Sequence, residues 1–249
     1  MRIHFRPLLG LSIACAILFA FLNSLGVWQV QRLHWKLGLI AQVNQNLAAK
    51  PLTLGAALKM GPDGAQYHRV ALDGRFDNAK ESYVFTTDAN GDAVFHVVTP
   101  FETGAGVFLV DRGLVPPALK DPSTRRAGQI EGDTRVVGVW RIPDPPGFFT
   151  PPPDRAARVW YSRNIGGMAA ASGVKLVEPV IVEADAAPNP GGWPKGGQTV
   201  VTFRNEHLQY AITWFALAAG LLGVYLAYHV SRGRLGLVAG KETGKGAQP

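Results

Sequence analysis

The chain has 249 residues, 47% of them hydrophobic, and a formal net charge of +7 at pH 7. Two stretches, residues 7–31 and 207–231, contain no Asp, Glu, Lys or Arg, which argues against a purely soluble globular protein. The one cysteine, Cys15, excludes an intrachain disulfide. The basic residues form no patch interleaved with aromatic residues, so we do not expect nucleic acid as a partner.

The two uncharged stretches are long enough to cross a lipid bilayer. At about 1.5 Å per residue, each forms a helix of roughly 37 Å, against a bilayer core of about 30 Å. The excess positive charge lies at the two ends of the chain, and the positive-inside rule therefore places both ends in the cytoplasm. The predicted organisation is a cytoplasmic N-terminus (1–6), a transmembrane helix (7–31), a periplasmic domain (32–206), a second transmembrane helix (207–231) and a cytoplasmic tail (232–249).

The first stretch is an anchor in this interpretation, not a processed leader. It is longer than the apolar region of a signal peptide, and no small-residue cleavage site closes it, so we expect it to be retained. No long amphipathic leader rich in Arg and Ser precedes it, which favours a bacterial protein over an organelle-imported precursor.

The segment between the two stretches changes from a helical to a β pattern. Residues 33–58 suit a helix that continues the first span and breaks near Pro51. Asn90-Gly91 is typical of a hairpin tip, and a short helix is predicted over residues 164–173. Runs rich in β-branched and aromatic residues predict strands at 70–76, 82–87, 94–101, 107–111, 135–142, 159–162 and 180–183. We therefore expect one mainly antiparallel β (α+β) domain between two transmembrane helices that form a hairpin.

Small residues recur every four positions in both predicted spans. Such stripes let membrane helices approach closely, and they predict a tight helix hairpin, although alanine is common enough here to produce them by chance. The stripes are Ala16, Ala20 and Ser24 in the first span and Ala219, Gly223 and Ala227 in the second.

No pattern of a known catalytic centre is present. The sequence has no G-x-S-x-G elbow, no phosphate-binding loop, no H-E-x-x-H and no paired cysteines. The carboxylates of the middle segment lie mainly in turns, where they typically form local hydrogen bonds. We therefore expect a protein that is not an enzyme.

Unusual residues gather where the first span ends and the second begins. His207, Tyr210 and Trp214 share one helix face, and an imidazole flanked by aromatic rings at a bilayer edge can serve as an axial ligand of haem iron. Arg32, which follows Trp28 and Gln29, could pair with a haem propionate while the tryptophans pack on the macrocycle. His34 is a weaker candidate ligand. The aromatic residues could instead form an interface belt, Arg32 could extend to the membrane surface, and His207 could bond Glu206, Asn205 or water.

The same residues carry a resemblance to a known family. Leu25-Gly26-Val27-Trp28-Gln29-Val30-Gln31-Arg32-Leu33-His34-Trp35-Lys36 is similar to the G-x-W-Q-x-x-R-x-x-W-K signature of the Surfeit locus protein 1 family. Asn205-Glu206-His207-Leu208-Gln209-Tyr210-Ala211-Ile212-Thr213-Trp214-Phe215 resembles the opening of that family's second span. Val110-Asp111-Arg112-Gly113 with Val115-Pro116 resembles its R-G-W-V-P element, where Leu114 departs from the usual Trp.

The resemblance implies a cytochrome c oxidase assembly factor of the bacterial inner membrane. Such a protein would bind haem a as cargo and help to install it in oxidase subunit I, with His207 as the iron ligand. The implied partners are oxidase subunit I, the haem a synthase and membrane lipid, with no turnover chemistry. Two alternatives stay open: a bitopic envelope scaffold that binds only proteins, and an unrecognised periplasmic enzyme.

Overall fold

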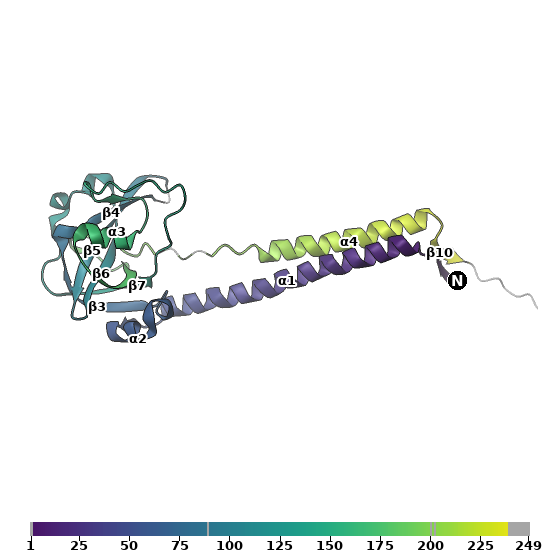
Figure 1. The fold of residues 1–249 in the computed structure, drawn as a ribbon, viewed down its shortest axis with the longest axis horizontal. Coiled ribbons are helices and arrows are strands. Elements are labelled where there is room, and N and C mark those ends of the chain that lie inside the picture. Colours follow the sequence, from purple (N-terminus) through teal and green to yellow (C-terminus); the bar gives the residue numbers. More distant parts are fainter. Residues whose placement is uncertain (1, 89, 200, 202, 239–249) are drawn as a thin grey trace, which may run out of the picture. The chain divides into compact units, whose positions relative to one another are not determined.

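The computed structural model describes residues 2–88, 90–199, 201 and 203–238 (Figure 1). They fall into two compact units: a helical unit drawn from residues 1–40 and 203–249, and a β domain drawn from residues 41–202. Most of the predicted C-terminal tail, residues 239–249, lies outside the described residues. The two candidate spans thus belong to one unit, and the strand-rich segment forms the other.

Two long antiparallel helices dominate the helical unit. Helix α1 runs over Leu9–Ala48 and helix α4 over His207–Ser231, and both are long and apolar enough to cross a membrane. They lie side by side (Figure 1), with the Ser12 and Tyr225 hydroxyls 2.6 Å apart. The predicted continuation of the first helix beyond residue 31 is confirmed. It ends just before Pro51, because a proline disfavours helical backbone in the residue that precedes it.

The contact between α1 and α4 uses other residues than the predicted stripes. The stripe residues are exposed along the hairpin, and a Cβ added to Gly223 would meet nothing within 4 Å. The prediction that these stripes pack the helices together was wrong, since a four-residue spacing does not determine which side of a helix faces its partner. The buried positions recur instead at spacings of three, four, seven and eleven, which are sums of the three- and four-residue steps of a coiled-coil seam. They are Leu22, Gly26 and Gln29 on α1 and Ala211, Ala218 and His229 on α4.

A short antiparallel ribbon closes one end of the helix pair. Strand β1 (Arg2–Phe5) pairs with strand β10 (Leu235–Val238), which brings the N-terminal segment next to the segment that follows α4. Beside it the fully buried His229 packs against Phe5, with ring centroids 5.5 Å apart, and its Nδ1 bonds the Tyr225 carbonyl at 2.9 Å. The sequence did not predict this ribbon, because both runs resemble the charged flanks of the spans.

The β domain is a sheet that closes on itself. Its strands are β2 (Leu52–Thr53), β3 (Arg69–Phe76), β4 (Ser82–Thr87), β5 (Ala93–Thr103), β6 (Gly106–Val115), β7 (Thr134–Arg141), β8 (Val159–Trp160) and β9 (Leu176–Ala184). Strands β3, β7, β9, β6 and β5 pair in that order, and the end of β5 pairs again with β3. A Cβ on Gly74 of β3 would lie 2.0 Å from the Glu102 carbonyl oxygen of β5, so glycine is required where the ring closes.

The predicted strand positions and the mainly antiparallel pairing are both confirmed. The hairpin between β4 and β5 turns at Asn90-Gly91 as predicted, where Gly91 adopts a φ of 87°. However, β9 is parallel to β6, β8 is parallel to β4, and β2 is parallel to β3, so the sheet is mixed. Parallel pairing requires long crossover connections, which local patterns do not reveal.

Short helices fill the connections between strands. They are α2 (Leu54–Gly64), α3 (Ile165–Ser172) and the 3-10 turns η1 (Asn78–Lys80), η2 (Pro117–Leu119), η3 (Pro122–Gly128) and η4 (Pro190–Gly192). Helix α3 confirms the prediction over residues 164–173. The Asn164 side chain accepts a hydrogen bond from the Gly167 N–H at its start, and Gly173 ends it with a φ of 62°.

The interior of the ring is packed with large apolar side chains. Trp140 of β7 and Phe108 of β6 are fully buried, with ring centroids 5.8 Å apart. Ala57 of α2 joins the same cluster, while Met168 of α3 packs into a neighbouring one around Trp160. Burying a side chain of this size contributes about 1.5–3 kcal/mol to stability, so this core fixes the strand register of the domain.

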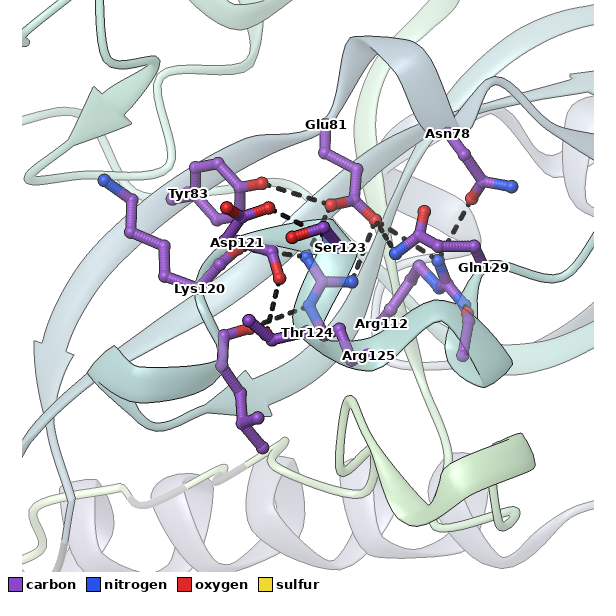
Figure 2. A network of polar contacts seen from close by, with 12 residues as sticks. Asn78, Glu81, Tyr83, Arg112, Lys120, Asp121, Ser123, Thr124, Arg125 and Gln129 are labelled. Carbon is purple, nitrogen blue, oxygen red and sulfur yellow. Dashed lines mark hydrogen bonds and ion pairs between the residues drawn. The ribbon is translucent and has the colours of Figure 1, made fainter.

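A buried ionic network joins η3 to strands β4 and β6 (Figure 2). The Glu81 carboxylate accepts hydrogen bonds from Arg125 at 2.5 Å and 3.2 Å and from Gln129 at 3.1 Å, and it lies 3.4 Å from Arg112 Nη1. Arg112 also donates to the Gly128 carbonyl. Burial lowers the pKa of the Arg112 guanidinium to about 10 and raises the pKa of the Tyr83 phenol to about 12. With these pKa values, Arg112 stays protonated and Tyr83 keeps its phenolic proton at neutral pH.

Candidate functional site

The predicted site residues lie in the helical unit, at the opposite end of the helix pair from the β1–β10 ribbon. Here α4 begins at His207, and the His207 Nδ1 atom lies 2.7 Å from Gln29 Oε1 on α1. Gln29 is 91% buried between the helices. Because an amide oxygen only accepts hydrogen bonds, Nδ1 is the donor, and a neutral imidazole in this arrangement has its lone pair on Nε2. This tautomer is typical of histidines that ligate a metal through Nε2.

Arg32 stands one turn beyond Gln29 on α1, between two tryptophan rings. Its guanidinium carbon lies 5.7 Å from the Trp28 ring centroid and 5.6 Å from the Trp35 ring centroid. The predicted flanking of a cation by aromatic rings is thus confirmed, whereas its role towards a ligand stays a prediction. Both rings are about half exposed, so they present apolar faces around an available positive charge.

Further charged contacts flank the start of α4. Arg204 Nε bonds Glu206 Oε1 at 2.6 Å, which holds the pKa of the Glu206 carboxyl below its usual range and raises the pKa of Arg204. The Lys36 ammonium lies 5.0 Å from the centroid of the Phe203 ring. Glu206 is therefore engaged by Arg204, and the hydrogen-bond partner of His207 is Gln29, not Glu206 or Asn205 as the alternative interpretation expected.

The other predicted residues are near this cluster in sequence, but no described side-chain hydrogen bond joins them to it. Tyr210 is half exposed and Trp214 is partly buried, in the first two turns of α4 after His207. His34 is exposed on α1. The structure thus brings together Gln29 with His207 and Trp28 with Arg32, and it leaves Tyr210, Trp214 and His34 as neighbouring side chains.

A close approach of α1 and α4 sets how the two helices align at the end that contains His207. A Cβ on Gly26 would lie 2.6 Å from the Phe215 ring, so the ring occupies the space that glycine leaves open. Gly26 lies one turn before Gln29, and Phe215 lies two turns after His207, so this contact supports the histidine–glutamine pair. The sequence analysis included Phe215 in the motif that resembles the family's second span, but it did not predict the contact with Gly26, because a local pattern does not reveal a partner on another helix.

The arrangement suits a flat, partly anionic ligand with a metal at its centre. His207 offers one imidazole nitrogen, Arg32 offers a planar fork of donors for a carboxylate, and the tryptophan faces offer apolar contact. A protein that ligates iron already held in a macrocycle needs to supply only axial ligands, which one histidine can provide.

Comparisons with known proteins agree with the resemblance found in the sequence. A profile of the SURF1 family matches residues 16–219, which include every predicted site residue. Surfeit locus protein 1 of Rattus norvegicus is 37% identical over 225 residues, covering 84% of this chain and 72% of that protein. The Homo sapiens protein of the same name is 37% identical over 213 residues (79% and 70%), and that of Takifugu rubripes 34% over 229 residues (84% and 92%). This chain therefore belongs to the SURF1 family.

Proposed function

We propose that this protein is a cytochrome c oxidase assembly factor that binds haem a and assists its insertion into oxidase subunit I. The observation that carries the proposal is the His207–Gln29 hydrogen bond of 2.7 Å, which commits Nδ1 and leaves Nε2 for iron. Membership of the SURF1 family, known for cytochrome c oxidase assembly factors, supports the biological role.

Each of the neighbouring side chains has a part in this proposal. Arg32 pairs with a haem propionate, because a guanidinium fork bonds a carboxylate through two parallel hydrogen bonds. Trp28 packs against the macrocycle, and Tyr210 and Trp214 cover it from α4. Gln29 is a positioning residue, since it fixes the orientation and tautomer of the imidazole without contacting iron.

The proposed location is the bacterial inner membrane, with the β domain in the periplasm. The length and apolar composition of α1 and α4 support insertion, and the positive charges at the chain ends support cytoplasmic termini. Helix α4 begins at His207, so the haem site would lie at the periplasmic surface of the inner membrane. Oxidase subunit I and the haem a synthase are the proposed partners, alongside membrane lipid. The protein would act as a carrier without catalytic turnover.

The visible absorption spectrum of the purified full-length protein tests this function. Protein from a host that makes haem a should show a haem a spectrum, and protein from a host that lacks haem a should not. Colourless protein from both hosts would contradict the proposal and favour the alternative, a bitopic scaffold that binds only protein partners.

A further inference from the structure

Three arginines gather at the ribbon end of the helix pair, and the proposed haem site uses none of them. Arg6 directly follows β1, while Arg232 and Arg234 lie in the turn that leads from α4 into β10. Arg6 and Arg232 are exposed, and Arg234 is partly exposed, so all three are accessible to a ligand. We name these three residues the ribbon arginines.

The backbone of the ribbon brings two of these charges together. Its register pairs Phe5 with Leu235, and beyond that pair the Arg6 N–H donates to the Arg234 carbonyl at 2.8 Å. Arg234 Nη1 in turn donates to the Arg6 carbonyl at 3.4 Å. Arg6 and Arg234 therefore stand opposite each other across the ribbon. Like charges in opposite positions destabilise a strand pair, so this arrangement favours an anion between them.

The described part of the helical unit supplies no such anion at this end. Residues 1–62 and 207–241 contain no Asp or Glu, and the one described carboxylate side chain of the unit, Glu206, lies at the opposite end of the helix pair. The helix dipoles do not compensate the charges either. Helix α4 ends here and α1 begins here, so their opposite partial charges largely cancel.

The surroundings of the ribbon arginines suit a lipid surface. The Arg232 guanidinium carbon lies 5.6 Å from the centroid of the Tyr228 ring. Tyr228 is 38% exposed and Phe5 is 47% exposed, at the end of two helices that are apolar enough to cross a membrane. Aromatic and basic side chains in this position are typical of the boundary between acyl chains and headgroups. A guanidinium fork also matches two oxygens of a phosphate group.

We propose that the ribbon arginines bind the phosphate group of an anionic phospholipid. A zwitterionic phospholipid suits them less well, because its ammonium group adds a positive charge beside three guanidinium groups. The acyl chains of the bound lipid lie along the apolar helices, a contact that a free phosphate ion cannot make. In the proposed topology this lipid belongs to the cytoplasmic leaflet. The inference thus rests on the proposed membrane insertion and not on haem binding.

Native mass spectrometry of the full-length protein in detergent tests the inference, because it measures lipid binding whichever way the protein is oriented in a membrane. The probes are phosphatidylglycerol and phosphatidylcholine with the same acyl chains, and inorganic phosphate is the comparator. Phosphatidylglycerol should bind saturably and at least about fivefold more tightly than either. Combining Arg6→Gln with Arg232→Gln should weaken its binding roughly tenfold. Neither side chain makes a hydrogen bond among the described residues, so the helix pair should stay folded.

The matched control combines Lys36→Gln with Arg204→Gln, which removes the same charge from the opposite end of the helix pair. It should bind phosphatidylglycerol within twofold of the unmodified protein. The inference is overturned if phosphatidylglycerol binds no more tightly than phosphatidylcholine or phosphate, if the Arg6 and Arg232 variant binds like the unmodified protein, or if the control weakens binding as much. Each of these outcomes is compatible with a normal haem a spectrum, so the inference can fail while the proposed function stands.

Discussion

Glu81 carries the one negative charge that faces two buried guanidinium groups, those of Arg112 and Arg125 (Figure 2). All three side chains are about 2% exposed, so none of these charges is solvated by water. Removing one partner of such a pair leaves an uncompensated charge in the interior. At the scale of single residues, the β domain therefore depends on this carboxylate more than on any of its surface ion pairs.

Glu81→Gln should lower the free energy of unfolding of the β domain by about 3–5 kcal/mol, because Arg112 and Arg125 keep their charges without a counterion. Urea unfolding followed by fluorescence measures this loss. The control is Glu102→Gln, whose exposed pair with Arg75 should contribute less than about 1 kcal/mol. Equal effects of the two substitutions would contradict the account.

The Asp111 carboxyl makes the stability of the β domain depend on pH, and the direction of its pKa shift gives the sign. Burial alone would raise the pKa of this carboxyl, but His96, Arg163 and the Gly113 N–H together bring the pKa below its usual value. Its stabilising contribution is therefore complete above about pH 4 and is lost as the pH falls through the lowered pKa of the folded state. The stability difference between the unmodified protein and Asp111→Asn should narrow as the pH falls from 5 to 2 in urea titrations. A difference that stays constant over this range would contradict the assignment.

At the scale of elements, the candidate site depends on the pairing of α1 with α4. Gln29 and His207 are 178 positions apart in sequence and meet only because the helices are antiparallel and in this register. The register is set by contacts such as that of Gly26 with Phe215. The residues of the two small-residue stripes do not contribute, since they lie on exposed sides of the helices.

Gly26→Leu should separate the helices, because a side chain there collides with the Phe215 ring. The distance between spin labels at the exposed positions Ile13 and Val224, in a Cys15→Ser background, should lengthen or broaden on this substitution. Gly223→Leu should leave that distance unchanged, since nothing lies within 4 Å of an added Cβ. If Gly223→Leu disrupted the pair and Gly26→Leu did not, the small-residue stripe would be the contact after all.

Sequence patterns within single segments predicted the helices and strands well. What they did not predict has one cause. The hairpin tip at Asn90-Gly91 and the end of α3 at Gly173 follow from backbone preferences of single residues, so the sequence alone sufficed. The parallel pairing of β6 with β9, the β1–β10 ribbon and the Gln29–His207 bond join residues far apart in the chain. Hydropathy and spacing carry no information about such partners, whereas the choice of His207 and Arg32 as candidate haem contacts came from the chemistry of their side chains and stays a prediction.

At the scale of the whole molecule, the strand before α1 and the strand after α4 pair at one end of the helix pair, as the β1–β10 ribbon. The Gln29–His207 pair marks the other end of the region where α1 and α4 run together. Helix α1 continues beyond that pair to Ala48. A hairpin of this form that spans a membrane must place both ends on one side and the connection on the other.

Reporter fusions test that topology directly. Alkaline phosphatase, which is active only after export, should be active when fused after about residue 120 and inactive when fused at residue 240. The physical reason is the positive charge at the two ends, which keeps them in the cytoplasm. The reverse pattern of activity would place the His207 end of the helix pair on the cytoplasmic side.

We propose that His207 supplies an axial nitrogen to the iron of haem a. The most direct measurement compares the haem content and visible spectrum of the purified His207→Ala and His34→Ala variants, after membrane insertion of each has been verified. His34 is the matched control, because it is an exposed histidine on α1 close to the same end of the helix pair. We predict that His207→Ala inserts normally but loses its haem a or shifts its absorption bands, whereas His34→Ala keeps both. Normal haem content with an unshifted spectrum in His207→Ala would contradict the account.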